Sequence, residues 1–160
     1  MIINPDAPGG NTIFCDDIRH EITGKTTLVG TYNNVMIVSG DLPVTIPQIC
    51  ASITLRLQPP HEPIEPVFKI FRTDQVEPLF VLETKLEAVN TDEILQERPF
   101  MEPDAPRLMQ LSVVAQLQGL VIFESCALKV RAYIGDDEVR LGALLIQTIT
   151  QETAVEEINA

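Results

Sequence analysis

The residues of this sequence best suited to acid/base chemistry are a carboxylate and an imidazole, Asp16 and His20. If residues 12–22 form a β-strand, both side chains fall on one of its two faces. Three apolar residues share that face: Phe14, Ile18 and Ile22. Neighbours on one strand face are about 7 Å apart, so a water or a shared partner could join the two polar groups. The functional interpretation is a proton-transfer pair in a metal-dependent or hydrolytic enzyme, completed by acids from loops.

The structural interpretation of the same pair is favoured, because no plausible nucleophile lies near it in the sequence. A carboxylate that faces a core needs hydrogen-bond donors, so we expect Asp16 to pin a loop and His20 to lie at the rim of a sheet. A bulge at Asp16 and Asp17 would instead turn both acids outward. We therefore interpret Asp16 and His20 as structural polar residues and predict no catalytic residue in the chain.

A second candidate is the tripeptide Gly24-Lys25-Thr26, which matches the end of a phosphate-binding P-loop. The P-loop needs an earlier glycine five residues before Gly24, where this sequence has Arg19. The motif should also open a helix, whereas residues 26–38 are rich in threonine and valine, which favour strands. We therefore predict a hairpin turn with Lys25 in solvent, and no bound nucleotide.

The spacing of acids and cysteines does not favour a metal site. Four aspartates lie near predicted turns, where calcium-binding sandwiches gather their ligands: Asp41, Asp74, Asp136 and Asp137. Calcium needs six to eight converging oxygens, and the sequence has no Asp-x-Asp spacing, so calcium at these loop acids is the less favoured alternative. Cys15, Cys50 and Cys126 are far apart and predict reduced, partly buried thiols. We expect no metal and no other cofactor, since hydrolase and dinucleotide motifs are absent as well.

Composition limits the partners and the location of the chain. It has 160 residues, enough for one domain with a real core, and its 11 basic and 23 acidic residues give a formal charge of −12. An acidic surface repels phosphate backbones, so we expect no nucleic-acid partner. No apolar run approaches the ~20 residues of a membrane span, and the N-terminus lacks the pattern of a secretory signal. We therefore expect no membrane partner, and a location in the cytoplasm of the cell of origin or of a host, or in a virion.

Hydrophobic side chains alternate with polar ones almost throughout, which is typical of half-buried antiparallel strands. Turn residues separate about eight such strands: 12–22, 26–38, 48–57, 67–72, 79–89, 108–117, 121–134 and 138–149. One apolar face per strand predicts an all-β, two-sheet antiparallel β-sandwich, either immunoglobulin-like or C2-like, over residues 12–149. Residues 1–11 would be an N-terminal extension, and residues 150–160 an acidic C-terminal tail.

Two segments interrupt the alternation. Residues 59–66 contain four prolines and predict an extended connection that protects one sheet edge. Residues 90–106 form the longest irregular stretch, and four apolar residues stand among its acids: Ile94, Leu95, Phe100 and Met101. These four side chains either cover the open end of the sandwich or form a protein-contact patch.

A resemblance to a known family lies in the segment FCDDIRHEITGKTTLVGTYNNVMIV, residues 14–38, followed by Pro43 and Pro47. This segment resembles the opening of a family of small uncharacterised bacterial and bacteriophage proteins. The shared pattern is a Cys-Asp strand, a Gly-Lys turn and a Gly-x-Tyr strand that lead into a proline-marked connection. The similarity covers mainly residues 12–57 and, more loosely, residues 126–149. It implies a β-sandwich, and because the family is of unknown function it implies no site residue.

Elimination and surface composition together favour a protein that works by contact. No motif for catalysis, metal or phosphate is convincing, while an apolar-acidic loop and an acidic tail suit protein contact. We predict a non-enzymatic protein–protein contact or assembly module of bacterial or bacteriophage type, whose partner is another protein or a second copy of itself. The alternative is a metal-dependent or hydrolytic enzyme that uses Asp16, His20 and loop acids.

Overall fold

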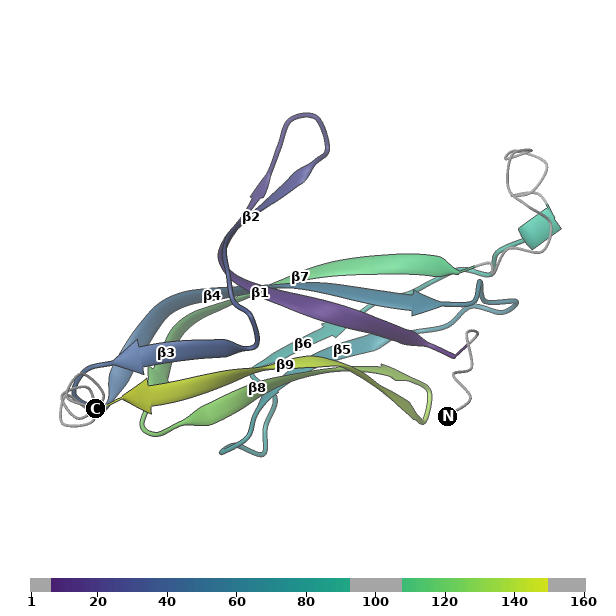
Figure 1. Ribbon diagram of the computed structural model, residues 1–160. Coiled ribbons are helices and arrows are strands. Elements are labelled where there is room, and N and C mark those ends of the chain that lie inside the picture. Colours follow the sequence, from purple (N-terminus) through teal and green to yellow (C-terminus); the bar gives the residue numbers. More distant parts are fainter. Residues whose placement is uncertain (1–6, 93–107, 150–160) are drawn as a thin grey trace.

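The computed structural model describes residues 7–92 and 108–149, which form nine strands in two packed sheets (Figure 1). The four-stranded sheet has the order β2 (Thr26–Thr31), β1 (Gly9–His20), β4 (Val44–Leu57), β7 (Met109–Ile122). The five-stranded sheet has the order β3 (Val35–Ser39), β9 (Asp137–Ile149), β8 (Cys126–Ile134), β5 (Val67–Arg72), β6 (Phe80–Glu83). The predicted all-β, two-sheet sandwich is confirmed, but it is not antiparallel throughout, because β3 pairs with β9 in the parallel direction. In the described ranges no helix is long and apolar enough to cross a membrane.

The core is built from one face of each sheet, as the alternation predicts. On β4 the five apolar side chains expected to share a face are buried: Ile49, Ala51, Ile53, Leu55 and Leu57. Strands β7 and β8 add alternate residues from opposite sheets, among them Ala115 and Leu128, which are fully buried. Each large aliphatic side chain buried in this way stabilises the fold by about 1.5–3 kcal/mol. Burial of alternate residues therefore fixes which face of each strand looks inward.

A β-bulge lets β9 keep its apolar face inward along its whole length. Val130 of β8 pairs with Gly142, whereas the next residue, Arg131, pairs with Arg140, so Leu141 is the extra residue. The inward positions change from odd to even at this point, from Val139 and Leu141 to Leu144 and Ile146. Gly142 has φ +118°, a conformation that residues with a side chain rarely adopt. The bulge therefore explains why this one strand does not alternate regularly in sequence.

Three expected strands are shorter or divided. Residues 26–38 form two strands in different sheets, because Asn34, with φ +68°, turns the chain between β2 and β3. Residues 121–134 are interrupted at 123–125, between β7 and β8. Of residues 79–89, only β6 is a strand, followed by the single bridge between Ile64 and Leu86. Strand β1 also begins at Gly9, before the expected domain start at residue 12.

One charged residue lies inside the sandwich near its end. Arg72, the last residue of β5, is 5% exposed, and its Nε lies 2.6 Å from Asp74 Oδ1. Its Nη1 donates a hydrogen bond of 2.6 Å to the carbonyl oxygen of Val121 on β7. The side chain therefore ties the five-stranded sheet to the edge strand of the other sheet, beside an open groove of about 360 Å³.

Candidate functional site

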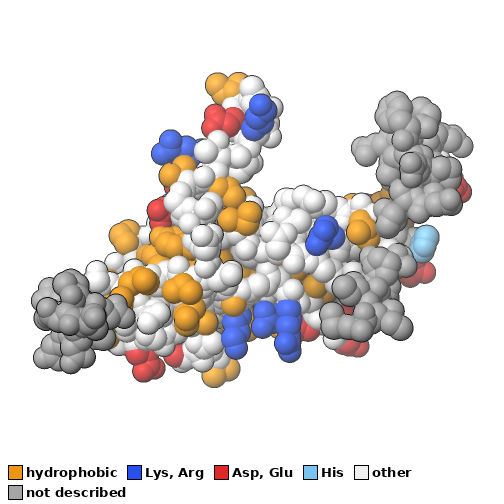
Figure 2. All heavy atoms as spheres, in the orientation of Figure 1, with side chains coloured by type: hydrophobic (Ala, Val, Ile, Leu, Met, Phe, Trp, Pro, Cys, Tyr) orange, Lys and Arg blue, Asp and Glu red, His pale blue; other side chains and the backbone are white. Residues whose placement is uncertain are grey.

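The most prominent surface feature is a hairpin arm, residues 16–31, that projects from the four-stranded sheet (Figure 1). Strand β1 pairs with β4 only as far as Cys15, and from there to His20 it pairs with β2 alone. The arm therefore lacks a second layer, and most of its residues are exposed. Its tip carries the fully exposed Ile22, and Figure 2 shows hydrophobic atoms at that point.

The arm corrects the expected environment of the β1 face. Phe14 is buried as predicted, but Ile18 is only half-buried and Ile22 lies in solvent. The alternation continues past Cys15, yet the strand has left the sandwich, so there is no core for these side chains to enter. The prediction that this face stays buried along residues 12–22 was wrong for that reason.

The tripeptide Gly24-Lys25-Thr26 forms the end of the arm. Glu21 N donates to the Lys25 carbonyl oxygen at 2.8 Å, and Gly24 N donates to the Glu21 carbonyl oxygen at 3.0 Å. Gly24 has φ +79°, which suits glycine in a tight turn, and strand β2 starts at Thr26. The predicted hairpin turn is confirmed and Lys25 is exposed. The absence of nucleotide binding stays a prediction.

The arm is joined to the sandwich by a polar contact between β1 and Tyr32, the residue that follows β2. The hydroxyl of Tyr32 donates a hydrogen bond to Asp16 Oδ1, and Tyr32 N donates to the Phe14 carbonyl oxygen at 2.9 Å. Gly30 lies directly against the Asp16 carboxylate. Its φ is +66°, and a Cβ added to it would be 2.0 Å from Asp16 Oδ2. Burial, and next the hydrogen bond to Asp16, raise the pKa of Tyr32 to about 12. The two defined residues of the Gly-x-Tyr pattern therefore both contact the Asp16 carboxylate: Gly30 leaves space for it, and Tyr32 donates a hydrogen bond to it.

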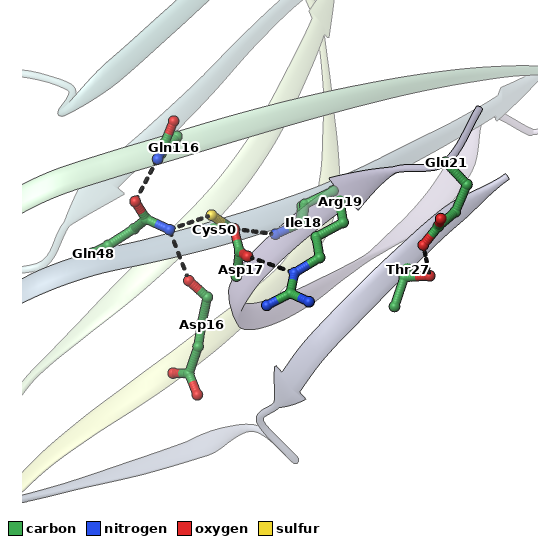
Figure 3. Close-up of polar contacts among 9 residues, drawn as sticks. All are labelled: Asp16, Asp17, Ile18, Arg19, Glu21, Thr27, Gln48, Cys50 and Gln116. Atoms are coloured by element: carbon green, nitrogen blue, oxygen red, sulfur yellow. Dashed lines mark hydrogen bonds and ion pairs between the residues drawn. The ribbon is translucent and has the colours of Figure 1, made fainter. Parts of the chain in front are cut away.

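A chain of side-chain amides continues from this joint across the outer face of the sheet (Figure 3). Gln48 on β4 donates from Nε2 to the Asp16 carbonyl oxygen at 3.0 Å. Gln116 on β7 donates from Nε2 to Gln48 Oε1. The base of the arm, the central strand and the edge strand are thus linked by hydrogen bonds. Periodicity alone gave no indication of this link, because it depends on how three strands are placed beside one another.

Asp16 and His20 are not brought together. The register of β1 with β2 is regular from Asp17 to His20, so this part of β1 is extended. Asp16 and His20 are four residues apart, which is about 13 Å along an extended strand. This is twice the spacing of about 7 Å between neighbours on one strand face that was expected from the sequence. Asp16 is engaged by Tyr32, and His20 is exposed on the arm. The described geometry therefore does not form the acid/base pair, and the structural roles of Asp16 and His20 stay predictions.

The three cysteines are free and buried. Burial is the main cause that raises the pKa of each thiol, at Cys15, Cys50 and Cys126. Cys15 lies directly opposite Cys50 across the β1–β4 pairing. The sequence spacing did not reveal this neighbourhood.

Two candidate sites remain, the metal site at the turn aspartates and the protein-contact patch of residues 90–106. Within residues 7–92 and 108–149, no three His, Cys, Asp or Glu side chains are grouped as metal ligands. Of the four turn aspartates, Asp74 is taken up by its ion pair with Arg72. The proposed contact residues Ile94, Leu95, Phe100 and Met101 lie outside the described residues, as does the tail 150–160.

The edge strand β7 is a second notable surface. It is 14 residues long and contains no charged residue and no proline. It pairs with β4 along almost its whole length, from Val44↔Ile122 to Leu57↔Met109. In the part of the chain that the structure describes, no strand pairs with its other edge. Natural proteins usually protect such an edge with charges, prolines or a covering segment.

In comparisons with models of protein families and with curated proteins, no match to this chain was found. The resemblance to bacterial and bacteriophage proteins therefore stays a prediction from the sequence. The candidate site rests on the geometry of the arm and of β7 alone.

Proposed function

We propose that this protein is a non-enzymatic contact or assembly module of bacterial or bacteriophage type, and that it binds another protein chain along the free edge of β7. The observation that carries the proposal is the edge itself, a strand of 14 uncharged residues. Among the described residues no strand pairs with its outward edge, although the carbonyl oxygen of Val121 accepts from Arg72, and such an edge can take an added strand, which is a common mode of protein recognition. The partner is a second protein or a second copy of this chain.

The side chains along β7 suit such a contact. Its outer face carries Gln110, Ser112, Val114, Gln116 and Gln118, which are exposed and uncharged. A strand added at this edge would meet hydrogen-bonding amides and one exposed valine without burying an ion. An edge free of charge also limits the repulsion that a protein of formal charge −12 exerts on a second copy.

The test compares two variants, one with a lysine on the edge strand β7 and one with a lysine on the edge strand β6 of the other sheet. Val114 on β7 and Val81 on β6 are both valines on edge strands, 42% and 48% exposed. Val114→Lys should abolish association, because lysine on an edge strand opposes strand addition, whereas Val81→Lys should leave it unchanged. Association is measured as mass by light scattering after size exclusion, and as recovery of a partner from the source cell.

The two variants have the same net charge, so the comparison removes general electrostatic effects. If the wild-type protein is monomeric and recovers no partner, or if both variants behave alike, the proposed edge contact is wrong. A melting temperature raised by several degrees with a divalent metal or a small molecule, in the absence of any protein partner, would favour the enzyme alternative instead.

A further inference from the structure

The outer face of the five-stranded sheet gathers cations in an otherwise acidic protein. Lys69 on β5 lies opposite Arg131 on β8, and Arg131 lies opposite Arg140 on β9. Lys129 follows on the same face of β8, two residues from Arg131. These four residues, named here the basic row, are four of the 11 lysines and arginines in the chain. Figure 2 shows Lys and Arg side chains grouped on the lower surface of the molecule.

The basic row is costly for the fold by itself. Like charges that lie directly opposite on neighbouring strands destabilise a sheet. Glu138 offsets part of this repulsion, since its Oε1 lies 3.2 Å from Arg131 Nε and 3.8 Å from Arg140 Nε. Among the described strand residues, the other acid on this face is Glu83, opposite Val67. Over the strand residues of this face alone, four cations and two acids sum to +2, on a chain whose total is −12.

An apolar strip continues the same face toward the β3 edge. Leu145 on β9 pairs with Val35 on β3, and Ile37 follows on the same side. These three residues, the apolar strip, are 44%, 42% and 62% exposed. Lys129 lies opposite Ala143, two residues from Leu145, so the row and the strip adjoin.

We propose that this face is a second interaction surface, whose partner is an acidic amphipathic segment of another protein. Carboxylates of the segment would lie over the basic row, and its apolar side chains would cover the apolar strip. Charge complementarity favours an acidic partner, and the exposed strip favours one that carries apolar side chains. A nucleic acid fits less well, because it offers no such side chains and the rest of the acidic surface repels its phosphates.

This surface is independent of the edge of β7. The two lie on different sheets, and the outer faces of a sandwich look away from each other. One protein molecule can therefore hold a strand at β7 and an acidic segment on the basic row at the same time.

The experiment measures binding of labelled probes to the whole protein by fluorescence anisotropy. The first probe is a peptide of about twelve residues that combines glutamates with leucines, the second has glutamine in place of every glutamate, and the third is a short single-stranded DNA. We expect the glutamate peptide to bind best, and its affinity to fall as salt is added. Tighter binding of the DNA, equal binding of both peptides, or no binding of the glutamate peptide would each overturn the proposal.

Matched variants locate the binding. Lys129→Gln with Arg140→Gln should weaken binding of the glutamate peptide about tenfold, because it removes two exposed cations of the row. Lys25→Gln with Arg56→Gln removes two exposed cations, on the arm and on β4 of the other sheet, and should change the affinity less than about twofold. Leu145→Gln should weaken it about threefold through the strip. Equal weakening by both double variants would show that total charge, not the row, attracts the probe, and no effect of Leu145→Gln would exclude the apolar contact.

Discussion

The phenol of Tyr32 donates a hydrogen bond to the carboxylate of Asp16 across Gly30, at the place where β1 leaves the sandwich. Without a core on either side, the arm depends on such contacts for a defined orientation. A side chain at position 30 would occupy the space of the carboxylate, so glycine, tyrosine and aspartate form one unit. The arm and the sandwich are therefore coupled through a joint whose parts are separable by mutation.

Gly30→Ala should lower the free energy of unfolding by about 2–3 kcal/mol. Alanine at φ +66° costs about 1–2 kcal/mol, and its Cβ also displaces Asp16 from Tyr32. The control is Gly24→Ala, at φ +79°, where an added Cβ meets nothing within 4 Å, so only about 1–2 kcal/mol is lost. Urea unfolding compares the two, and equal losses would show that the Asp16 contact contributes nothing.

The raised pKa of Tyr32 predicts a loss of stability at high pH. The folded value is about 12, against 10.0 ordinarily, so the unfolded chain releases its proton first. The stabilisation is then fully present below about pH 10 and is lost as the pH rises toward about 12. We expect the free energy of unfolding to fall more steeply in this range for the wild type than for Tyr32→Phe.

The tyrosine itself is observable, because the chain has only two tyrosines. In a Tyr133→Phe background the absorbance of tyrosinate reports Tyr32 alone. Asp16→Asn should lower the pKa of Tyr32, since it removes the negative charge beside the phenol. An unchanged titration would mean that burial accounts for the whole shift.

Asp74→Ala should destabilise the protein by about 2–3 kcal/mol. The substitution leaves the Arg72 cation, only 5% exposed, without its carboxylate. Glu87→Ala is the control, because it breaks the exposed Lys85–Glu87 pair at 2.7 Å and should cost less than about 0.5 kcal/mol. Thermal melting followed by circular dichroism measures both, and similar small changes would show that solvent replaces Asp74 at Arg72.

Lys25→Ala should change the free energy of unfolding by less than about 0.5 kcal/mol, since Lys25 is exposed in the turn of the arm. We also expect neither the variant nor the wild type to bind ATP or GTP measurably in calorimetry. Micromolar affinity in the wild type that disappears in the variant would contradict the assignment of this turn.

Local patterns in the sequence located most of the core and most of the strands, although residues 26–38 and 121–134 are each divided between two strands. In residues 48–57 the alternation of apolar and polar side chains correctly predicts which face of β4 is buried, because this alternation depends on the sequence of that strand alone. The turn at Gly24 is local in the same sense, since glycine and the neighbouring strand formers decide it. The need of Asp16 for a hydrogen-bond donor was also expected from the sequence, but its donor, Tyr32, was not.

The tertiary structure alone decided which strands meet. Alternation in β1 continues unchanged past Cys15, so the sequence could not show that β1 leaves β4 at this point, while β4 continues beside β7, and that Ile22 ends in solvent. The basic row also escapes sequence analysis, because Lys69 and Arg131 lie far apart in the chain and become neighbours through strand register. An apolar face in the sequence indicates that one side of a strand can be buried. Which segment covers that side, and which charged side chains become neighbours, depends on the pairing between strands that are distant in the sequence.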